Sequence, residues 1–337
     1  MFNRSMVTTS LADTPFDYTP FAAASALAVG LVLFAAGADV ASADDVNDAS
    51  ETAGSATIRS ADTIKPDGKI QTIGEGYAFT EGPSSDGNGG FYFTDIPNTA
   101  IHHVDADGEV TRFTDQSGHA NGLWVIGDGG MLACQMDGRV VRYDLATGES
   151  TVLADKYNDA RFNAPNDIVP DREGGFYFTD PLYRAPKPLP QGDQSVYHVD
   201  AGGKVTRVVD ALPAPNGIGM SPDGSRLYVA PSGDSKMMVY QIDAPGKLSG
   251  GRVHCVITQV GDEVGGGSDG ITVDVRGNVY YTTAAGVEIV SPEGESLNII
   301  KFPQKPANVT FAGPDKQTMV VTARTGVYTV KMPIAGL

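Results

Sequence analysis

The chain has 337 residues, only 19% of them charged, and it contains 41 glycines and 21 prolines. The formal net charge of −17 argues against a nucleic-acid partner, because phosphate binding needs a basic surface, and it disfavours anionic membrane surfaces for the same reason. Gly and Pro residues occur frequently between short runs of Val, Ile, Tyr and Phe, and this pattern predicts an all-β fold rich in turns.

The first 43 residues predict an export signal or a membrane anchor. The uncharged, Ala- and Leu-rich stretch 21–38 is followed by Ala41-Ser42-Ala43, a small-x-small pattern typical of signal cleavage. Arg4 is the only basic residue before that stretch, which is unusual for a signal peptide, and the stretch is near the lower length limit for a spanning helix. We expect export to the periplasm or the medium after cleavage near Ala43, with membrane anchoring as the alternative. Residues 44–65, rich in Ala, Ser, Asp and Thr, predict a flexible linker.

Residues 66–337 contain six copies of one pattern, spaced about 40–50 residues apart, the range of a four-stranded propeller blade. In each copy a Gly- or Pro-rich approach delivers one oxygen-bearing side chain just ahead of a short strand. These side chains belong to Glu81, Asn121, Asn166, Asn216, Asp269 and Asn308. A tight turn and a second strand follow, most clearly in the nearly identical Gly-Phe-Tyr-Phe-Thr-Asp runs at 90–95 and 175–180.

Third and fourth strands complete each unit, so we predict a six-bladed β-propeller with four-stranded antiparallel blades around a central channel. The strand at 69–73 is expected to close the ring by pairing with the strand at 326–331. Cys134 and Cys255 form no Cys-x-x-Cys pair, so free buried thiols are expected, while a single bridge stays open for an exported protein.

The first strand of a propeller blade lies innermost, so the six side chains are expected to line one mouth of the channel. Among them, Glu81, Asn166, Asn216 and Asp269 supply two carboxylates and two amide carbonyls. Such oxygen ligands suit Ca²⁺ or Mg²⁺ better than Zn²⁺, and two negative charges match one divalent cation. Each Asn-Gly or Asp-Gly alone is also explained as a turn-former. The set at equivalent positions predicts the cation.

Other residues near this mouth are candidates for substrate binding. The second strands return to the mouth, which places Asp180 and Tyr183 there. Asn121 could support a ligand, face the substrate or serve only the fold. His119 and Arg161 are further candidates for polar contacts, although a lone His is more often structural.

Residues 161–169 (Arg-Phe-Asn-Ala-Pro-Asn-Asp-Ile-Val), followed by Phe178-Thr179-Asp180-Pro181-Leu182-Tyr183, resemble the signature of the SMP-30/gluconolactonase/LRE-like family, whose relatives include calcium-dependent lactonases and diisopropylfluorophosphatase. The segments around Glu81, Asn216 and Asp269 match the family's other ligand-bearing segments, and the resemblance covers about 73–330. It implies Glu81, Asn216 and Asp269 as core ligands of one divalent cation. Asn166 would be a fourth ligand in some relatives and a substrate contact in others.

The resemblance also implies that Mg²⁺, Mn²⁺ or Zn²⁺ could replace Ca²⁺. Pro170 departs from the family's apolar strand and predicts a bulge or an edge there.

The expected function is a divalent-metal-dependent hydrolase that opens a sugar lactone with a metal-activated water. Asp269 is expected to act as general base, or as nucleophile in a covalent variant, with Asp180 and His119 as other proton acceptors. A phosphotriesterase or fluorophosphatase is the second enzymatic hypothesis. A non-catalytic binding module with a structural cation is the third. The expected partner is a small-molecule lactone, and no stable protein partner is inferred.

Overall fold

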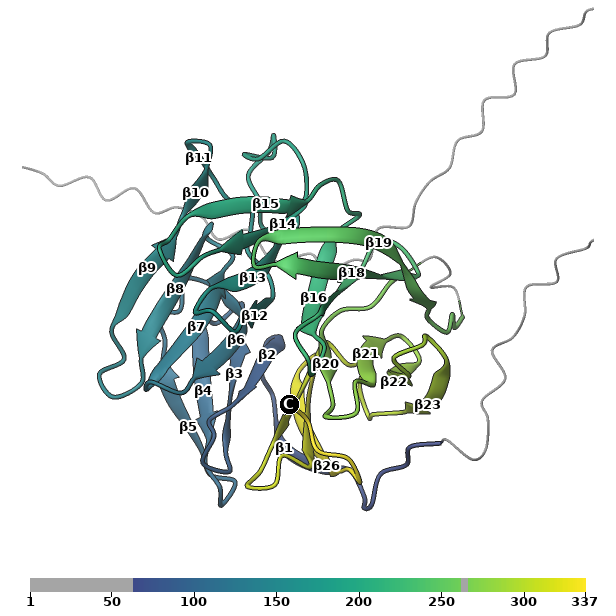
Figure 1. Ribbon diagram of the computed structural model, residues 1–337. Coiled ribbons are helices and arrows are strands. Elements are labelled where there is room, and N and C mark those ends of the chain that lie inside the picture. Colours follow the sequence, from purple (N-terminus) through teal and green to yellow (C-terminus); the bar gives the residue numbers. More distant parts are fainter. Residues whose placement is uncertain (1–62, 262–265) are drawn as a thin grey trace, which may run out of the picture. The chain divides into compact units, whose positions relative to one another are not determined.

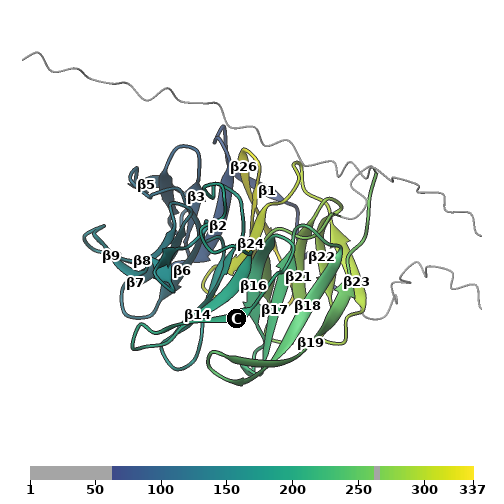
Figure 2. The ribbon, with the colours of Figure 1, turned by 90° about the horizontal axis from the view of Figure 1, so that it is seen from above.

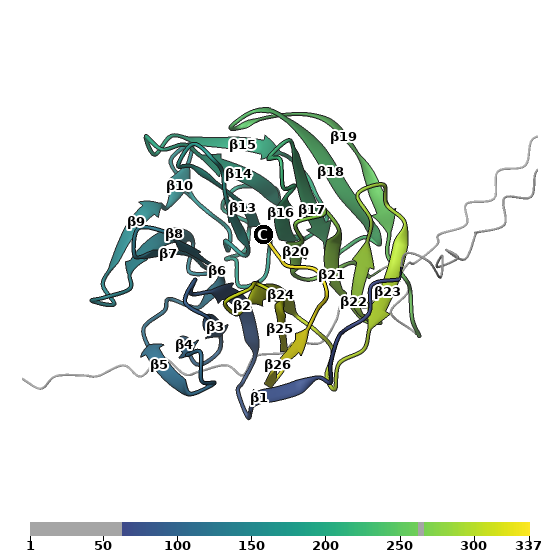
Figure 3. The same ribbon diagram turned by 60° about the horizontal axis from the view of Figure 1, so that its bottom comes forward.

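Six four-stranded antiparallel sheets follow one another around a common axis, as the six sequence repeats predict (Figure 3). The computed structural model describes residues 63–261 and 266–337, all of which belong to the compact unit Ala56–Leu337. The predicted signal or anchor segment and the linker up to residue 62 lie outside the described residues. Within the described ranges we find no helix with the length and hydropathy needed to span a bilayer.

The blades are numbered 1 to 6 in the order in which their innermost strands follow one another along the chain. Blade 1 contains β2 (Thr80–Ser85), β3 (Phe91–Asp95), β4 (Ala100–Val104) and β5 (Val110–Thr114); blade 2 contains β6 (Ala120–Ile126), β7 (Gly130–Gln135), β8 (Arg139–Asp144) and β9 (Ser150–Ala154). Blade 3 contains β12 (Ile168–Pro170), β13 (Phe176–Asp180), β14 (Ser195–Val199) and β15 (Val205–Val209). The short hairpin of β10 (Lys156–Tyr157) and β11 (Ala160–Arg161) precedes blade 3 (Figure 1).

Blade 4 contains β16 (Pro215–Met220), β17 (Arg226–Pro231), β18 (Lys236–Ala244) and β19 (Lys247–Val256). Blade 5 contains β20 (Ile271–Val273), β21 (Val279–Thr283), β22 (Gly286–Val290) and β23 (Ser296–Ile300). Blade 6 contains β24 (Asn308–Ala312), β25 (Thr318–Ala323), β26 (Gly326–Lys331) and, from the other end of the sequence, β1 (Gln71–Glu75).

The ring closes through blade 6, where β1 pairs antiparallel with β26 (Figure 2). The prediction of this closure is confirmed, with the strand starting two residues later than expected. Because β1 is hydrogen-bonded to β26 in the last blade, the N-terminal and C-terminal parts of the propeller are joined in one sheet. Ile64, which falls in the predicted linker, is buried in this part, and its carbonyl accepts a hydrogen bond from Asn298 Nδ2 at 2.8 Å.

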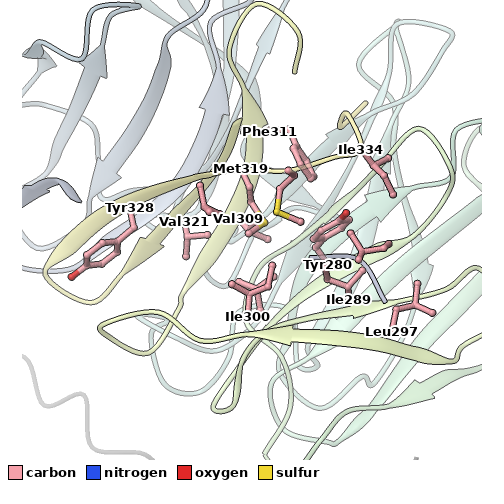
Figure 4. Close-up of a cluster of buried hydrophobic side chains, with 14 of the residues drawn as sticks. Tyr280, Ile289, Leu297, Ile300, Val309, Phe311, Met319, Val321, Tyr328 and Ile334 are labelled. Atoms are coloured by element: carbon pink, nitrogen blue, oxygen red, sulfur yellow. The ribbon is translucent and has the colours of Figure 1, made fainter. Parts of the chain in front are cut away.

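The core lies between neighbouring blades, which explains why the second strands are apolar on both faces. All five residues of β3 and of β13 are buried, as are those of β21. Figure 4 shows one such layer, in which Tyr280 and Ile289 of blade 5 pack against Phe311 and Met319 of blade 6. The fourth strands lie outermost (Figure 3), and most of their residues are at least partly exposed.

Two further predictions concern local features. Cys134 and Cys255 are both buried and free, in different hydrophobic clusters, so no bridge joins them. Pro170 ends β12, the edge strand of blade 3, where a missing N–H costs no sheet hydrogen bond on its open side.

Candidate active site

Three of the predicted site residues lie in interruptions of the innermost strands. The register between β2 and β3 shifts between Glu81 and Ser84, and equivalent shifts fall at Asn121 in β6 and at Asn216 in β16. A local irregularity of this kind turns a side chain out of the alternation of the sheet. The interruptions therefore direct these polar side chains toward the axis.

The glycine after each of these residues serves a close approach between blades. A Cβ on Gly82 would meet the carbonyl oxygen of Asn121 at 1.8 Å, and a Cβ on Gly217 would meet that of Asp269 at 2.5 Å. Gly217 N–H instead donates to Asp269 O at 2.8 Å, which joins blade 4 to blade 5. None of Asn121, Asn216 and Asp269 has a positive φ, so the left-handed turn offered as an alternative reason for these motifs is not what the structure uses.

Glu81 and Asp269 bring two carboxyl groups together at this mouth. Glu81 is 3% exposed, while Asp269 is partly exposed. Burial, and then the charge of Asp269, raise the pKa of Glu81 well above its usual range. Burial also raises the pKa of Asp269 to about 6, partly offset by Lys305, Arg324 and hydrogen bonds from Asn216 and Glu81. Without a cation, burial and their mutual repulsion therefore disfavour ionisation of both carboxyl groups together.

Asn216 is fixed in one orientation beside this pair. Its Nδ2 donates to Asp269 Oδ1 at 2.6 Å and to Ser232 Oγ at 3.0 Å. The Ser232 hydroxyl donates its proton to Ser268 O at 2.8 Å. Its oxygen is therefore the acceptor in the hydrogen bond with Asn216 Nδ2. Both amide protons of Asn216 are therefore used on one side, and its buried Oδ1 has no partner in the described part of the chain.

Two more amides add to the set. Asn121 Oδ1 is likewise buried without a partner among the described residues. Asn166 is 2% exposed; its backbone joins blades 2 and 3, since Gly122 N–H donates to its carbonyl at 2.7 Å. Buried amide oxygens without donors are costly, and a cation is the natural partner for an oxygen beside two carboxylates. The residues present therefore fit an oxygen-ligated divalent cation.

Asp167, which no sequence motif assigned to the site, lies there together with Asn308, one of the six residues expected at the mouth. Asp167 is 7% exposed and accepts from the N–H groups of Ile168 at 3.0 Å and Ile218 at 3.3 Å. Burial raises its pKa to about 7. The Asn308 side chain hydrogen-bonds both Asp167 and Glu81, which lowers the pKa of each carboxyl. Asn308 thus connects the carboxyl group of Glu81 to the buried carboxyl group of Asp167.

Asp180 lies at the mouth end of β13, as predicted, but the structure gives it a structural role. It is 0% exposed, and its carboxylate accepts from Asn163 N–H at 2.8 Å and Ala164 N–H at 2.7 Å. Asp95 at the end of β3 does the same for Ala78 and Phe79. We therefore interpret Asp180 as a support for the loop that carries Asn166 rather than as a group in contact with substrate.

Replacing Asp180 with Ala should lower the free energy of unfolding by about 2–4 kcal/mol, because two buried N–H groups lose their acceptor. Urea denaturation measures this. Asp210→Ala is the control, because its exposed carboxylate makes only a 3.5 Å ion pair with Arg207 and should matter little. An unchanged stability with a raised KM would instead return Asp180 to the substrate contacts.

The remaining predicted residues differ in their surroundings. Tyr183 is partly exposed, and burial together with Asp269 and Glu81 raises its pKa to about 12, which places it against the carboxyl pair. His119 is partly exposed and bonds Asp137 Oδ1 through Nδ1 at 3.1 Å. Arg161 donates to the carbonyls of Phe162 and Asn163, so it braces its own loop. Substrate contact by these residues stays a prediction.

Fold and site together define a class of protein: a six-bladed propeller that gathers buried carboxyl and amide groups at one mouth of its axis. The family model for the SMP-30/Gluconolactonase/LRE-like region matches residues 79–325, and the chain belongs to this family.

Individual relatives agree with this assignment. A gluconolactonase of Zymomonas mobilis is 29% identical over 293 residues, covering 79% of this chain and 82% of the relative. A pentonolactonase of Haloferax volcanii is 26% identical, covering 70% of this chain and 77% of the relative. The solved structure of a gluconolactonase from Xanthomonas campestris superimposes with a TM-score of 0.73 at 26% identity, covering 81% of this chain and 92% of that one.

Proposed function

We propose that this protein is a divalent-metal-dependent hydrolase that opens a sugar lactone. The observation that carries the proposal is the convergence of Glu81 and Asp269 with the unpartnered Oδ1 of Asn216. Membership of a family whose named relatives include gluconolactonase and pentonolactonase supports it.

Glu81, Asn166, Asn216 and Asp269 are proposed to hold the cation, and the all-oxygen donor set favours Ca²⁺. When bound, the cation would polarise the ester carbonyl and stabilise the negative charge that develops on its oxygen. Asn121 and Tyr183, which lie on the same mouth, are proposed to orient the sugar hydroxyls.

Asp269 is proposed as general base. Its Oδ1 accepts from Asn216 Nδ2, which leaves Oδ2 as the oxygen that takes a proton from the attacking water. Burial raises the pKa of Asp269 in the cation-free protein, and this would offset part of the basicity that the carboxylate loses to a bound cation.

The test is hydrolysis of glucono-1,5-lactone by the purified protein, followed by proton release, after chelation and after return of Ca²⁺, Mg²⁺, Mn²⁺ or Zn²⁺. We expect turnover that is lost on chelation and restored by a cation. Turnover of a chromogenic phosphotriester alone would favour the fluorophosphatase hypothesis. Cation-dependent stability without turnover of either substrate would favour a binding module.

Ser232→Ala should weaken cation binding about tenfold, because the Asn216 amide loses the acceptor that fixes its orientation. Calorimetric titration with Ca²⁺ measures the dissociation constant directly, without any substrate. Ser225→Ala is the control, since that hydroxyl bonds Asp223 in the hairpin at the opposite end of β17. Equal Ca²⁺ affinity in Ser232→Ala and the wild type would remove Ser232 from this role.

We also propose export of the mature protein after cleavage near Ala43. N-terminal sequencing of the protein recovered from cell fractions tests this. A mature terminus at residue 44 in the exported fraction supports cleavage, and an intact N-terminus in the membrane fraction supports the anchor.

A further inference from the structure

Two cationic residues stand on one side of the mouth, where blade 6 meets blades 5 and 1. Lys305 lies in the connection between β23 and β24, and Arg324 lies in the tight turn between β25 and β26. Both side chains are partly exposed. The sequence analysis assigned neither residue to the site, and the proposed mechanism uses neither.

The backbone places Arg324 next to Glu81. Thr80, the residue before Glu81, donates to the carbonyl of Arg324 through its N–H at 2.7 Å and through Oγ1 at 3.3 Å. The guanidinium lies 5.5 Å above the ring centroid of Phe79. In residues 63–261 and 266–337 no hydrogen bond or ion pair of this guanidinium is found, so its fork of donors is open to a ligand.

A second set of contacts holds Lys305 on the same side. Ala307 accepts from Gly270 N–H at 2.7 Å, which fixes the end of its loop beside Asp269. Gln304 Oε1 accepts from both the N–H and the Oγ1 of Thr325 at 3.1 Å. The loop of Lys305 and the turn of Arg324 are therefore tied together.

These cations are unexpected in a chain with a net charge of −17. The two mouth carboxylates are matched by the proposed cation, so they do not need Lys305 and Arg324 as partners once it binds. Arg324 would then keep a positive charge that no ion pair within the described residues neutralises, and such a charge attracts and orients anions. A neutral sugar gains nothing from that field, whereas an arginine fork matches the geometry of a carboxylate or phosphate.

We propose that Arg324, with Lys305 beside it, binds a negatively charged group of the substrate, so that the preferred lactone carries a carboxylate or a phosphate. This inference rests on the proposed lactonase function. It narrows the substrate class from sugar lactones in general to acidic ones.

The test compares kcat/KM for neutral glucono-1,5-lactone, its 6-phosphate and glucaro-1,4-lactone, which separates phosphate from carboxylate recognition. We expect an acidic lactone to be preferred at least tenfold and its rate to fall with added salt. Arg324→Gln should lower kcat/KM for that lactone about 10- to 100-fold, the loss expected for a charge-assisted hydrogen bond. Arg324→Lys should keep part of the preference, and the neutral lactone should lose much less.

Arg142→Gln is the matched control, because it removes the same charge from the far end of blade 2, where Arg142 pairs with Asp128. If the neutral lactone is preferred, or if Arg324→Gln lowers all three rates equally, the inference is overturned while the lactonase function stands. If no lactone is turned over, calorimetry with gluconate, 6-phosphogluconate and glucarate decides. Binding of an acidic compound that depends on Arg324 supports the anion site, and its absence overturns it.

Discussion

Asp269→Asn should still bind a divalent cation but turn over lactone about 10²–10⁴-fold more slowly than the wild type. The amide can accept from Asn216 Nδ2 as the carboxylate does, so the geometry of the mouth is kept. It cannot take a proton from water, and general-base assistance typically contributes this much to the rate. Single-turnover kinetics at saturating cation, with the cation dissociation constant measured separately, checks the result.

The pH dependence of kcat/KM in the same variant provides a second test of the base role of Asp269. If Asp269 is the base, the wild-type kcat/KM should rise with pH as this carboxyl ionises, and this limb should disappear in Asp269→Asn. Asp234→Asn is a suitable control, because that carboxylate accepts from Lys236 N–H in a turn at the same end of the propeller. Near-normal turnover by Asp269→Asn with bound cation would take the base role away from Asp269.

The six-fold pattern made the architecture predictable because each blade repeats the same sequence of local signals. Second strands such as β3 and β13 have almost the same sequence, and both are buried between neighbouring blades. The polar residue ahead of each first strand was predictable for the same reason. Equivalent positions in a closed repeat lie at equivalent distances from the axis, so Glu81, Asn216 and Asp269 converge although the sequence separates them widely.

What sequence analysis missed depends on contacts between blades. Asp167 follows Asn166 directly, but it becomes part of the site only because Gly122 of the neighbouring blade leaves room: a Cβ there would meet Asp167 Oδ1 at 2.5 Å. Ser232 follows the end of a second strand and has no recognisable motif, yet it decides how the Asn216 amide is turned. Such roles are set by residues far away in sequence, which a single chain read locally does not reveal.

The carboxyl pair also predicts an unusual stability pattern for Glu81→Gln. Without a cation, this variant should be more stable than the wild type at neutral pH, by roughly 1–3 kcal/mol, because on folding the glutamate must take up a proton or bury its charge beside Asp269, whereas the amide does neither. With excess Ca²⁺ the order should reverse. The wild type gains about 4.1 kcal/mol when the cation is present at a thousand times its dissociation constant, while the variant gains little.

The sign of the pH dependence follows from the same groups. The folded protein without a cation holds Glu81 and Asp269 at raised pKa values, so between about pH 4 and 6 it binds more protons than the unfolded chain. Their contribution is therefore favourable below pH 4 and is lost as the pH rises through the raised pKa of each group, which is about 6 for Asp269. Urea denaturation of wild type and Glu81→Gln, with chelator and with Ca²⁺, should show a steeper fall for the wild type with chelator than for the variant, because Asp167, Asp180 and Asp269 are buried in both and contribute a similar fall to each.

Glu288→Gln separates this effect from the general cost of altering a buried carboxylate. Glu288 is 1% exposed, but its oxygens accept from Thr258 N–H and Oγ1 and from Ser296 Oγ, so its charge is satisfied by the fold itself. Its replacement should destabilise the protein with or without Ca²⁺, whereas the effect of Glu81→Gln changes sign. The contrast arises because buried carboxylates that face hydrogen-bond donors stabilise the folded chain, and those that face each other need an ion. Destabilisation of Glu81→Gln both with chelator and with Ca²⁺ would mean that Glu81 is an ordinary structural carboxylate. Glu81 would then no longer be a proposed ligand of the cation.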